Sequence, residues 1–456
     1  MSVDWVAELQ HLLGAEGTLS GDAVGCDWSH DEALSAPWAT PLAVAIPNDR
    51  GQVNSIVEIA SRERVSIVPR GSGTGLSGGA NASATSMVLS TSKLNRILDI
   101  NERDLIAEVE AGVTLAQLDE ALAGIDLLYP VYPGEMGATI GGNLATNAGG
   151  MRAVRYGTTR NNVAGLDFVD GYAATVAAGG RFSKSSSGYD LSQLFIGSEG
   201  TLGIAVRALL RIQRRPRFSR SILILFPDVD AASETARDVL AAGCKPEILE
   251  YLEPQTFLLM ASTVKASVPE NQIAGARCLL LIELKGFDEA TVDRELLMLE
   301  NAVSKGSATE IFELPPKAAQ DVLRAREAAF WVAKSAGARE IVDSAIPPSR
   351  FGSFLAEARQ IAADHRVEIA AAGHLGDGNV HLSLFAPKLH PAKKAAAEIV
   401  QLAAEFGGAV SGEHGIGLAK QSEFLSNLDE RSYRIMRAIK QVFDPVGIMN
   451  PGKVLP

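Results

Sequence analysis

The sequence predicts an α+β protein built from two successive domains and a helical C-terminal segment. A glycine-rich stretch at residues 69–80 separates two short apolar strands, 65–68 and 87–89, with no helical pattern between them. After a basic stretch at 214–217, strands begin to alternate with longer helices. The chain has 456 residues, enough for two or three domains, and its 46% of hydrophobic residues excludes global disorder.

The first half of the chain is predicted to consist of short strands with a few helices. Residues 1–36 are expected to form a short helix and a linker. The elements expected after them are a strand at 42–46, a helix at 53–61, strands at 97–100 and 105–109, a helix at 114–122 capped by Thr114, a hairpin of 166–169 with 172–176, and a strand at 203–212. Asp170 and Gly171, between the two hairpin strands, are a strong turn signal.

The second half is predicted to form one antiparallel sheet with helices on one of its faces. The candidate strands are residues 221–226, 247–251, 278–284, 310–314 and 368–371, and the candidate helices are 231–242, 289–304 and 316–335. A further helix is expected at 430–443, close to the end of the chain.

Composition narrows the classes of function. The net charge of −12 argues against a nucleic-acid binder, because such proteins present a basic face. No apolar run is long enough to span a membrane, and the acidic, amphipathic N-terminus is unlike a secretory signal. The three cysteines are isolated, which indicates neither a disulfide framework nor an iron–sulfur cluster. We therefore expect a cytoplasmic protein without a transmembrane segment.

The glycine-rich stretch has the composition of an anion-binding loop. Residues 71–79 include five glycines, which let the backbone approach a ligand closely. Because a concave row of N–H groups suits a phosphate anion, one interpretation is a pyrophosphate site and the other is a flexible surface loop.

Two common nucleotide-binding designs fail at this loop. Gly73, Gly75 and Gly78 match the dinucleotide-binding fingerprint, and Asp99 lies near the expected distance downstream. However, small polar residues follow where that fingerprint requires a helix. A P-loop is excluded because no Lys-Ser/Thr pair follows the glycines.

The loop resembles the pyrophosphate loop of the vanillyl-alcohol-oxidase-type, or PCMH-type, FAD-binding domain. Residues 133–150 and 197–204 look like the second and third flavin-contacting stretches of that domain. The resemblance implies that FAD is bound by Pro69, Arg70, Gly71, Ser72, Gly73, Thr74, Gly75, Leu76, Pro133, Gly134, Gly137, Ala138, Thr139, Gly142, Asn143, Thr146, Asn147, Gly149, Gly150, Glu199, Gly203, Ile204 and Asn450. Members that bind flavin covalently through the first loop have a histidine there, and residues 71–79 contain none, so we expect non-covalent FAD.

Three of the seven histidines lie in two glycine-rich stretches near the C-terminal end. His374 and His381 bracket a Gly-Asp-Gly turn that can fold one imidazole toward the other, and Glu413 and His414 lie in the second stretch. Two imidazoles and a carboxylate with an open position form a common catalytic metal site. The alternative interpretation is a set of ordinary surface or core histidines.

From about residue 36 to its end, the chain resembles the FAD-linked D-2-hydroxyacid dehydrogenases, a family that includes D-lactate and D-2-hydroxyglutarate dehydrogenases and the flavin subunit of glycolate oxidase. The resemblance implies a PCMH-type FAD-binding domain at 37–215 and an α+β substrate (cap) domain with the metal site at 216–420. The segment 421–456 is then expected to return to the flavin domain.

The same resemblance assigns roles to the C-terminal residues. It implies that His374, His381 and Glu413 hold a divalent metal, Zn or Mn, and that His414 is the catalytic base. Arg326 matches the arginine that binds the substrate carboxylate; the alternative for Arg326 is an exposed helical arginine.

These assignments predict oxidation of a D-2-hydroxy acid to the 2-oxo acid by hydride transfer to flavin N5. The alternatives are a D-2-hydroxyglutarate dehydrogenase, a non-catalytic flavin subunit of a glycolate-oxidase-like complex, and a carbohydrate or alcohol oxidase of the same fold, which would not need the two histidines. Nothing resembles a nicotinamide site, so the expected electron acceptor is a quinone, an electron-transfer flavoprotein or a cytochrome. The chain is compatible with a homodimer.

The sequence departs from the family members that act on hydroxyglutarate. Those members have threonine, lysine and asparagine where this chain has Phe330, Ile341 and Ser383. Because a distal carboxylate needs a cation or several donors, these residues predict a substrate with a short or apolar side chain, such as D-lactate or D-2-hydroxybutyrate. Trp331 adds apolar surface nearby, whereas a slip of one or two residues in the alignment would bring Arg339 into the pocket and reverse the prediction.

Overall fold

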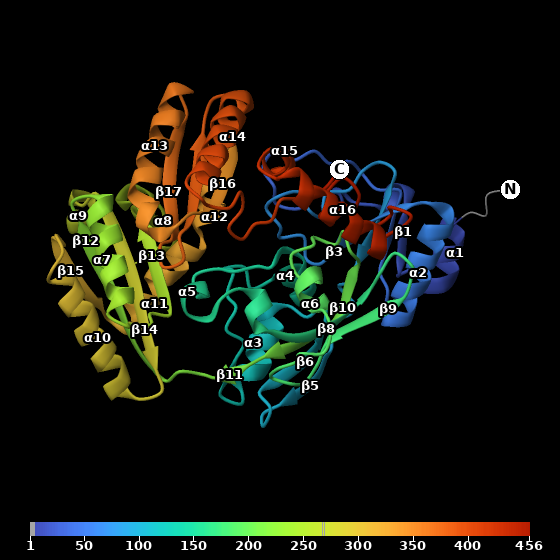
Figure 1. Cartoon of the computed structure of the whole chain (residues 1–456), viewed down its shortest axis with the longest axis horizontal. Helices are drawn as coiled ribbons and strands as arrows, with labels where there is room; N and C mark the ends of the chain where they lie inside the picture. The colour runs from blue at the N-terminus through green and yellow to red at the C-terminus, as the bar shows by residue number, and fades with distance from the viewer. Residues whose placement is uncertain (1–4, 267, 269) are drawn as a thin grey trace.

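The computed structural model describes residues 5–266, 268 and 270–456, which form two α/β domains side by side (Figure 1). We call residues 5–217 the N-terminal domain and the part that begins at β12 (Phe218–Phe226) the C-terminal domain. A short strand, β11 (Gln213–Arg214), pairs with β7 (Leu127–Leu128) just before the chain crosses from one domain to the other.

The N-terminal domain begins with a four-stranded sheet that supports the glycine-rich loop. Its strands, in sheet order, are β1 (Thr18–Ser20), β2 (Ala43–Ala45), β4 (Ser86–Ser90) and β3 (Ser66–Arg70). Strand β3 runs parallel to β4, and the described residues 71–85 between them contain no helix, as the sequence predicts. Helices α1 (Trp5–Leu13) and α2 (Arg50–Glu63) pack on this sheet through apolar side chains, including the fully buried Leu9 and Ile56.

A five-stranded antiparallel sheet forms the rest of this domain. Its strands, in sheet order, are β5 (Ile97–Asn101), β6 (Ile106–Glu110), β10 (Ile204–Arg211), β8 (Val163–Val169) and β9 (Thr175–Gly179). Strands β8 and β9 form the predicted hairpin. Helix α3 (Leu115–Ala123) begins at Thr114, whose hydroxyl accepts from the backbone N–H of Gln117 in a capping box. Helices α4 (Ile140–Thr146), α5 (Ala153–Tyr156) and α6 (Leu191–Phe195) complete the domain.

The C-terminal domain contains one antiparallel sheet of seven strands, in the order β15-β12-β14-β13-β17-β18-β16. The bounds of the strands other than β12 are β13 (Ile248–Leu252), β14 (Cys278–Gly286), β15 (Glu310–Leu314), β16 (Glu340–Ala345), β17 (Glu368–His374) and β18 (Asn379–Phe385). Asp343 of β16 lies opposite His381 of β18, which in turn lies opposite Ala372 of β17. The sheet register therefore places two polar side chains, Asp343 and His381, side by side on neighbouring strands.

Helices cover both faces of this sheet, so the prediction of helices on one face only is wrong. One layer consists of α7 (Val229–Ala241), α10 (Glu289–Val303), α13 (Phe351–Asp364) and α14 (Leu389–Glu405), and the other of α8 (Pro254–Val264), α9 (Glu270–Gly275), α11 (Pro316–Glu327) and α12 (Ala329–Ser335). In β12, Ile222 and Ile224 pack against the first layer and Leu223 and Leu225 against the second. A strand buried on both faces reads as a continuous apolar run, which hides the second layer in the sequence.

The helix expected at 316–335 is broken in two. Ala328 ends α11 and begins α12, and it stays in the right-handed helical region of the backbone. The break contains neither glycine nor proline, so it could not be predicted from the residue types at this point of the chain.

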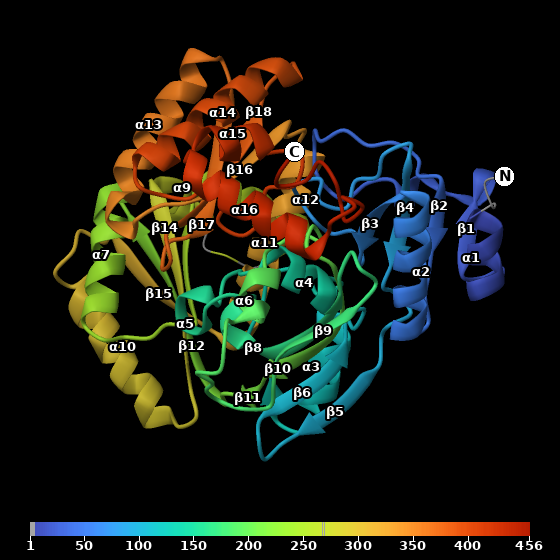
Figure 2. The same ribbon diagram turned by 45° about the vertical axis from the view of Figure 1, so that its right-hand side comes forward.

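The C-terminal segment returns to the N-terminal domain, where α15 (Gln421–Ser426) and α16 (Glu430–Phe443) lie across it (Figure 2). The Lys440 ammonium of α16 donates to the backbone oxygens of Thr201 and Met449, each at 2.7 Å. The backbone N–H of Asn450 donates to the Ile67 oxygen of β3 at 2.8 Å, so the chain ends beside the glycine-rich loop. None of the described helices is both long and apolar enough to cross a membrane.

Candidate functional site

A large cavity lies between the two domains. It contains about 2100 Å³ of space outside protein atoms, open solvent at its mouth included. Its lining includes both the glycine-rich loop and the histidines at 374, 381 and 414, so the two parts of the candidate site open onto one space. The glycine-rich loop forms one wall, residues from 133–151 form a second, and side chains of the C-terminal domain close the third.

Close backbone packing explains several of the glycines. A Cβ at Gly71 would clash with the Thr139 hydroxyl, so the first loop can approach the second flavin stretch only without a side chain there. Gly73 and Gly78 have φ of +75° and +77°, in the left-handed region that favours glycine. A Cβ at Gly150 would likewise overlap the backbone oxygen of Tyr132.

Most of the residues predicted to bind FAD line this cavity. They are Pro69, Gly71, Ser72, Gly73, Thr74, Gly75, Leu76, Pro133, Gly134, Ala138, Thr139, Gly142, Asn143, Thr146, Gly149, Gly150 and Glu199. The Asn143 side-chain N–H₂ is buried there and has no hydrogen-bond partner among the described residues. Since buried donors are normally paired, this orphaned group fits a wall that is completed by a bound polar molecule such as FAD.

The other predicted FAD residues are not among the residues that line the cavity. They are Arg70, Gly137, Asn147, Gly203, Ile204 and Asn450. The Arg70 guanidinium donates to the backbone oxygen of His30 at 2.7 Å. The Asn450 side-chain N–H₂ donates to the backbone oxygens of Gly79 and Glu199, at 2.9 and 2.7 Å. These two residues support the loops that form the wall.

The two predicted metal-ligand histidines come from one hairpin. His374 ends β17 and His381 lies in β18, and the turn between them contains Gly378 at φ +83°. A Cβ at Gly378 would clash with the backbone oxygen of Ile346, so glycine is required for this turn. The tight turn brings the two imidazole centroids to 5.0 Å.

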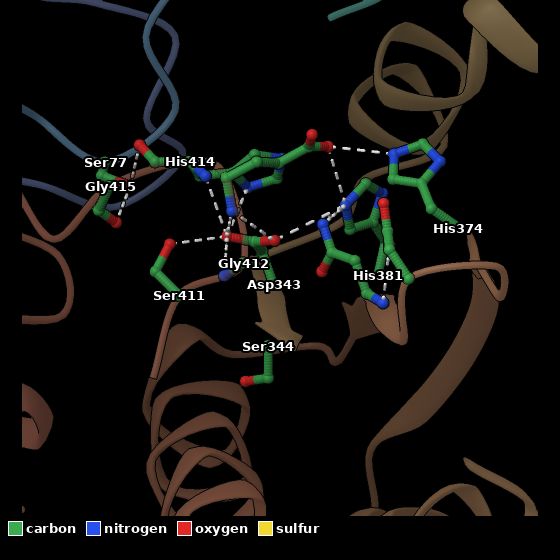
Figure 3. Close-up of polar contacts among 12 residues, drawn as sticks. Ser77, Asp343, Ser344, His374, His381, Ser411, Gly412, His414 and Gly415 are labelled. Carbon is green, nitrogen blue, oxygen red and sulfur yellow. Dashed lines mark hydrogen bonds and ion pairs between the residues drawn. The ribbon is translucent and has the colours of Figure 1, made fainter. Parts of the chain in front are cut away.

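Glu413 completes a compact group with these histidines. Its Oε1 lies 3.1 Å from Nε2 of His374 and 3.2 Å from Nε2 of His381. Two ligands of one tetrahedral ion bound at ~2.0–2.2 Å lie roughly 3.3 Å apart, so these three atoms could share a metal with little movement. Figure 3 shows the labelled His374 and His381 on one side of Asp343, with His414 on the other.

The charges in the group are strongly coupled. Burial opposes ionisation of Glu413, but the neighbouring His374 and His381 outweigh it and hold the pKa of Glu413 well below its usual value. Burial also opposes the charged form of His374, yet Glu250 and Glu413 raise the pKa of His374 well above its usual value. The carboxylates of Glu250 and Glu413 therefore favour a positive charge at this position, and either imidazole protons or a divalent cation could supply it.

Asp343 organises the loop that holds Glu413 and His414, and sequence reasoning missed it. Its buried carboxylate accepts from the Ser411 hydroxyl at 2.7 Å, the Lys420 ammonium at 3.1 Å and the backbone N–H of His414 at 2.9 Å. The backbone N–H groups of Gly412 and Glu413 also donate to it, at 3.2 Å each. Burial opposes its ionisation, but His414 and Lys420 hold the pKa of Asp343 well below its usual value.

Asp343, His381 and His414 form a second group with metal-ligand spacing. In this group the Asp343 oxygens are already engaged by the hydroxyl, ammonium and backbone donors of the 411–420 segment. The group with His374, His381 and Glu413 has fewer competing donors, so it is the better candidate for a metal.

Glu250 is the second acidic residue that sequence reasoning missed. It lies in β13, is fully buried, and accepts from Nδ1 of His374 at 2.6 Å and from Nε of Arg326 at 2.7 Å. A carboxylate behind a histidine fixes its tautomer and leaves the other nitrogen free for a metal. The available signal was a single glutamate inside an apolar strand, which is unusual unless the charge is paired.

Arg326 is buried in α11, 6% exposed, and it lines the cavity, so the alternative of an exposed helical arginine is wrong. One of its nitrogens, Nη2, has no hydrogen-bond partner within the described chain. Arg326 is also the only lysine or arginine among the described residues that line the cavity. Arg326 is therefore the one cationic side chain of the described cavity wall that could pair with an anionic group of a ligand.

His414 faces the same space beside the histidine pair. Its imidazole lies 5.0 Å, centroid to centroid, from that of His381. Burial lowers the pKa of His414 to about 4, although the charge of Asp343 opposes this change. The imidazole is therefore neutral at pH 7 and able to accept a proton.

The residues predicted to set substrate choice also line the cavity. Phe330, Ile341 and Ser383 are all part of its wall, together with Trp331 at its half-exposed edge. Ile341 and Ser383 lie opposite each other on β16 and β18, two residues along the strands from Asp343 and His381. Arg339, which a slip in the alignment would bring into the pocket, is exposed and lies outside the wall (its Nε donates to the Ala386 backbone oxygen at 3.3 Å).

Two protein-family models match successive parts of the chain. Residues 215–454 match the family of FAD linked oxidases, C-terminal domain, and residues 41–179 match the FAD binding domain family.

Three relatives illustrate the similarity over the whole chain. It is 34% identical over 459 residues to a D-lactate dehydrogenase from Archaeoglobus fulgidus, covering 99% of each chain. It is 35% identical over 455 residues to a glycolate oxidase subunit from Bacillus subtilis, covering 98% of this chain and 96% of the relative. It is 32% identical over 453 residues to a D-2-hydroxyglutarate dehydrogenase from Stutzerimonas stutzeri, covering 95% of this chain and 94% of the relative.

Solved structures show the fold. A 4-ethylphenol oxidase from Gulosibacter chungangensis superposes with a TM-score of 0.82 at 18% identity, and p-cresol methylhydroxylase with 0.80 at 16%; each match covers 99% of this chain and 96% of the other. The predicted PCMH-type FAD-binding fold is thereby confirmed.

Proposed function

The chain belongs to the FAD-linked oxidase family that includes D-lactate dehydrogenases, D-2-hydroxyglutarate dehydrogenases and glycolate oxidase subunits; on this premise we propose that it oxidises a D-2-hydroxy acid with a short or apolar side chain to the 2-oxo acid, using non-covalent FAD and a divalent metal. The observation that carries this proposal is the meeting of the metal-ligand group, a neutral histidine and a half-paired arginine in one cavity beside the glycine-rich loop. A non-catalytic subunit would not need all three.

The proposed division of labour follows from the chemistry of each group. His374, His381 and Glu413 would hold the metal, Zn or Mn, which supplies a Lewis acid that lowers the pKa of the substrate hydroxyl. The neutral imidazole of His414 takes the hydroxyl proton. Bound FAD supplies the acceptor for the hydride that leaves Cα, so the substrate loses one proton and one hydride and becomes the 2-oxo acid.

Arg326 is proposed to orient the substrate. Its Nε is held by Glu250, while its unpartnered Nη2 is available to the substrate carboxylate. Because Glu250 also holds Nδ1 of His374, one buried carboxylate connects the carboxylate-binding arginine with a metal ligand. Fixing both ends of the hydroxy acid in this way would fix the direction of its Cα–H bond.

The electron acceptor is proposed to be a quinone, an electron-transfer flavoprotein or a cytochrome. These acceptors are preferred to a nicotinamide nucleotide because the described residues 71–85 do not form the helix that a nicotinamide-binding glycine loop requires.

Removal of the metal is expected to abolish turnover while FAD stays bound, because the proposed ligands and the flavin loops are separate parts of the chain. The measurement is steady-state activity and flavin absorbance after dialysis against a chelator, followed by addition of Zn²⁺ or Mn²⁺. His381→Ala should behave like the chelated protein, and His365→Ala, a histidine paired with Glu398 outside the cavity, is the matched control. Full activity in protein shown by metal analysis to be free of metal would contradict the proposal.

His414→Ala is expected to lower kcat by roughly two to four orders of magnitude, the usual range for loss of a general base. The substrate KM should change little, because Arg326 and the metal ligands remain. In the unmodified enzyme, only the neutral imidazole can act, so activity is lost as pH falls through the pKa of about 4 that burial gives His414, rather than near pH 6.5. His390→Ala, an exposed histidine of α14, is the control. An active His414→Ala enzyme would show that another group takes the proton.

D-lactate and D-2-hydroxybutyrate are expected to have a higher kcat/KM than D-2-hydroxyglutarate. The reason is that Arg326 pairs with one carboxylate and no second lysine or arginine lines the described cavity, while an unpaired buried charge costs several kcal/mol (order of magnitude). Steady-state comparison of the three acids is the measurement. Ile341→Lys should raise the kcat/KM for the diacid, whereas Ile341→Met should not. A higher kcat/KM for D-2-hydroxyglutarate in the unmodified enzyme would contradict the apolar pocket.

A further inference from the structure

The loop that carries His414 is held from both domains. On one side, Asp343 of the C-terminal domain accepts from the backbone N–H of His414 at 2.9 Å. On the other side, Glu199 of the N-terminal domain accepts from the backbone N–H groups of Ile416 and Gly417, at 2.7 and 2.8 Å. The base therefore lies between two carboxylates that belong to different domains.

Glu199 is an unusual residue in its own right. Its side chain is buried, 7% exposed, and its backbone has φ +52°, a left-handed conformation that is unfavourable for an L residue. Its backbone oxygen accepts from the Asn450 side chain, which also donates to the Gly79 oxygen of the glycine-rich loop. The position of Glu199 is thus tied to the wall of the flavin cavity.

The glycine-rich loop contacts the His414 loop directly as well. The Ser77 hydroxyl lies 3.1 Å from the backbone oxygen of His414 and 2.9 Å from that of Gly415 (Figure 3). A Cβ at Gly417 would clash with the backbone oxygen of Ser77, so the two loops can meet at this distance only because residue 417 is glycine. The contact between the two loops extends over several consecutive residues. Among the described side chains, Glu199 is the only carboxylate that accepts hydrogen bonds from the backbone of residues 415–417.

We propose that Glu199 is a positioning residue, which holds the backbone just after His414 and thereby fixes the imidazole relative to the flavin wall of the cavity. Both carboxylate oxygens are used, one for each N–H group, so the loop is constrained in orientation as well as in distance. Glu199 was predicted to bind FAD and it lines the cavity, but its carboxylate accepts from the backbone N–H groups of Ile416 and Gly417. The inference rests on the proposed function, because His414 is taken as the base.

The first test is amide hydrogen exchange of the peptides that cover residues 412–420, measured on full-length protein without substrate. Glu199→Gln replaces one acceptor oxygen by an N–H₂ group that faces a backbone donor. We expect exchange at Ile416 and Gly417 to become about tenfold faster or more, because one of the two backbone N–H groups loses its acceptor oxygen. Glu283→Gln is the matched control: Glu283 is also buried, at 5% exposure, but lies in β14 and pairs with Lys285.

The second test is turnover of the FAD-loaded variants. Glu199→Gln is expected to lower kcat by about a hundredfold while the substrate KM and the flavin content stay unchanged, because a small misplacement of a reacting group has an effect of that size. Ser77→Ala, which loosens the same loop from the other contact, should lower kcat in the same way. The Ser77→Ala variant keeps the proposal testable if the Glu199→Gln protein does not fold.

The outcomes separate this inference from the proposed function. Wild-type exchange and wild-type kcat in both variants would overturn the positioning role, and so would a loss of kcat that follows loss of FAD in proportion. If the unmodified protein oxidises no D-2-hydroxy acid, the proposed function fails. The exchange measurement still decides whether Glu199 holds the loop.

Discussion

The buried carboxylate of Asp343 is the contact on which the rest of the candidate site depends. It is fully desolvated, and an isolated charge in that position would be strongly unfavourable. The Asp343 carboxylate accepts hydrogen bonds from Ser411, Lys420 and the backbone of residues 412–414. These bonds hold the 411–420 segment around its side chain. That loop carries Glu413 toward the histidine pair and His414 into the cavity. The need to satisfy one buried charge therefore sets the positions of a candidate metal ligand and a candidate base.

A second buried carboxylate, that of Glu250, positions Arg326 and His374 in the other half of the site. Glu250 joins Arg326 to His374, so the group proposed to bind the substrate carboxylate and the group proposed to bind metal cannot move independently. The connection lies beside two neighbouring strands, because Glu250 belongs to β13 and His374 ends β17. The N-terminal domain contributes the flavin wall and Glu199, which explains why the cavity is complete only where the domains meet.

How much of this the sequence could predict depends on whether the signal was local. The glycine loop, the His374–His381 turn and the 413–414 pair are short motifs, and the structure brings all of them to one cavity. Asp343 and Glu250 act through partners up to 77 and 124 residues away, and no spacing rule reveals such pairs. The second helix layer and the break at Ala328 were missed for a related reason: two-sided burial removes the alternation that marks a face, and the break has no glycine or proline.

The proposed function depends on one step, in which a D-2-hydroxy acid bound in this cavity reduces FAD. Anaerobic mixing of the FAD- and metal-loaded protein with D-lactate, followed in a stopped-flow spectrophotometer, tests it most directly because no electron acceptor is needed. We expect D-lactate to bleach the visible absorbance of the oxidised flavin within a single turnover, and L-lactate to leave it unchanged. Flavin that stays oxidised with D-lactate and with D-2-hydroxybutyrate, in protein shown to contain both FAD and metal, would contradict it.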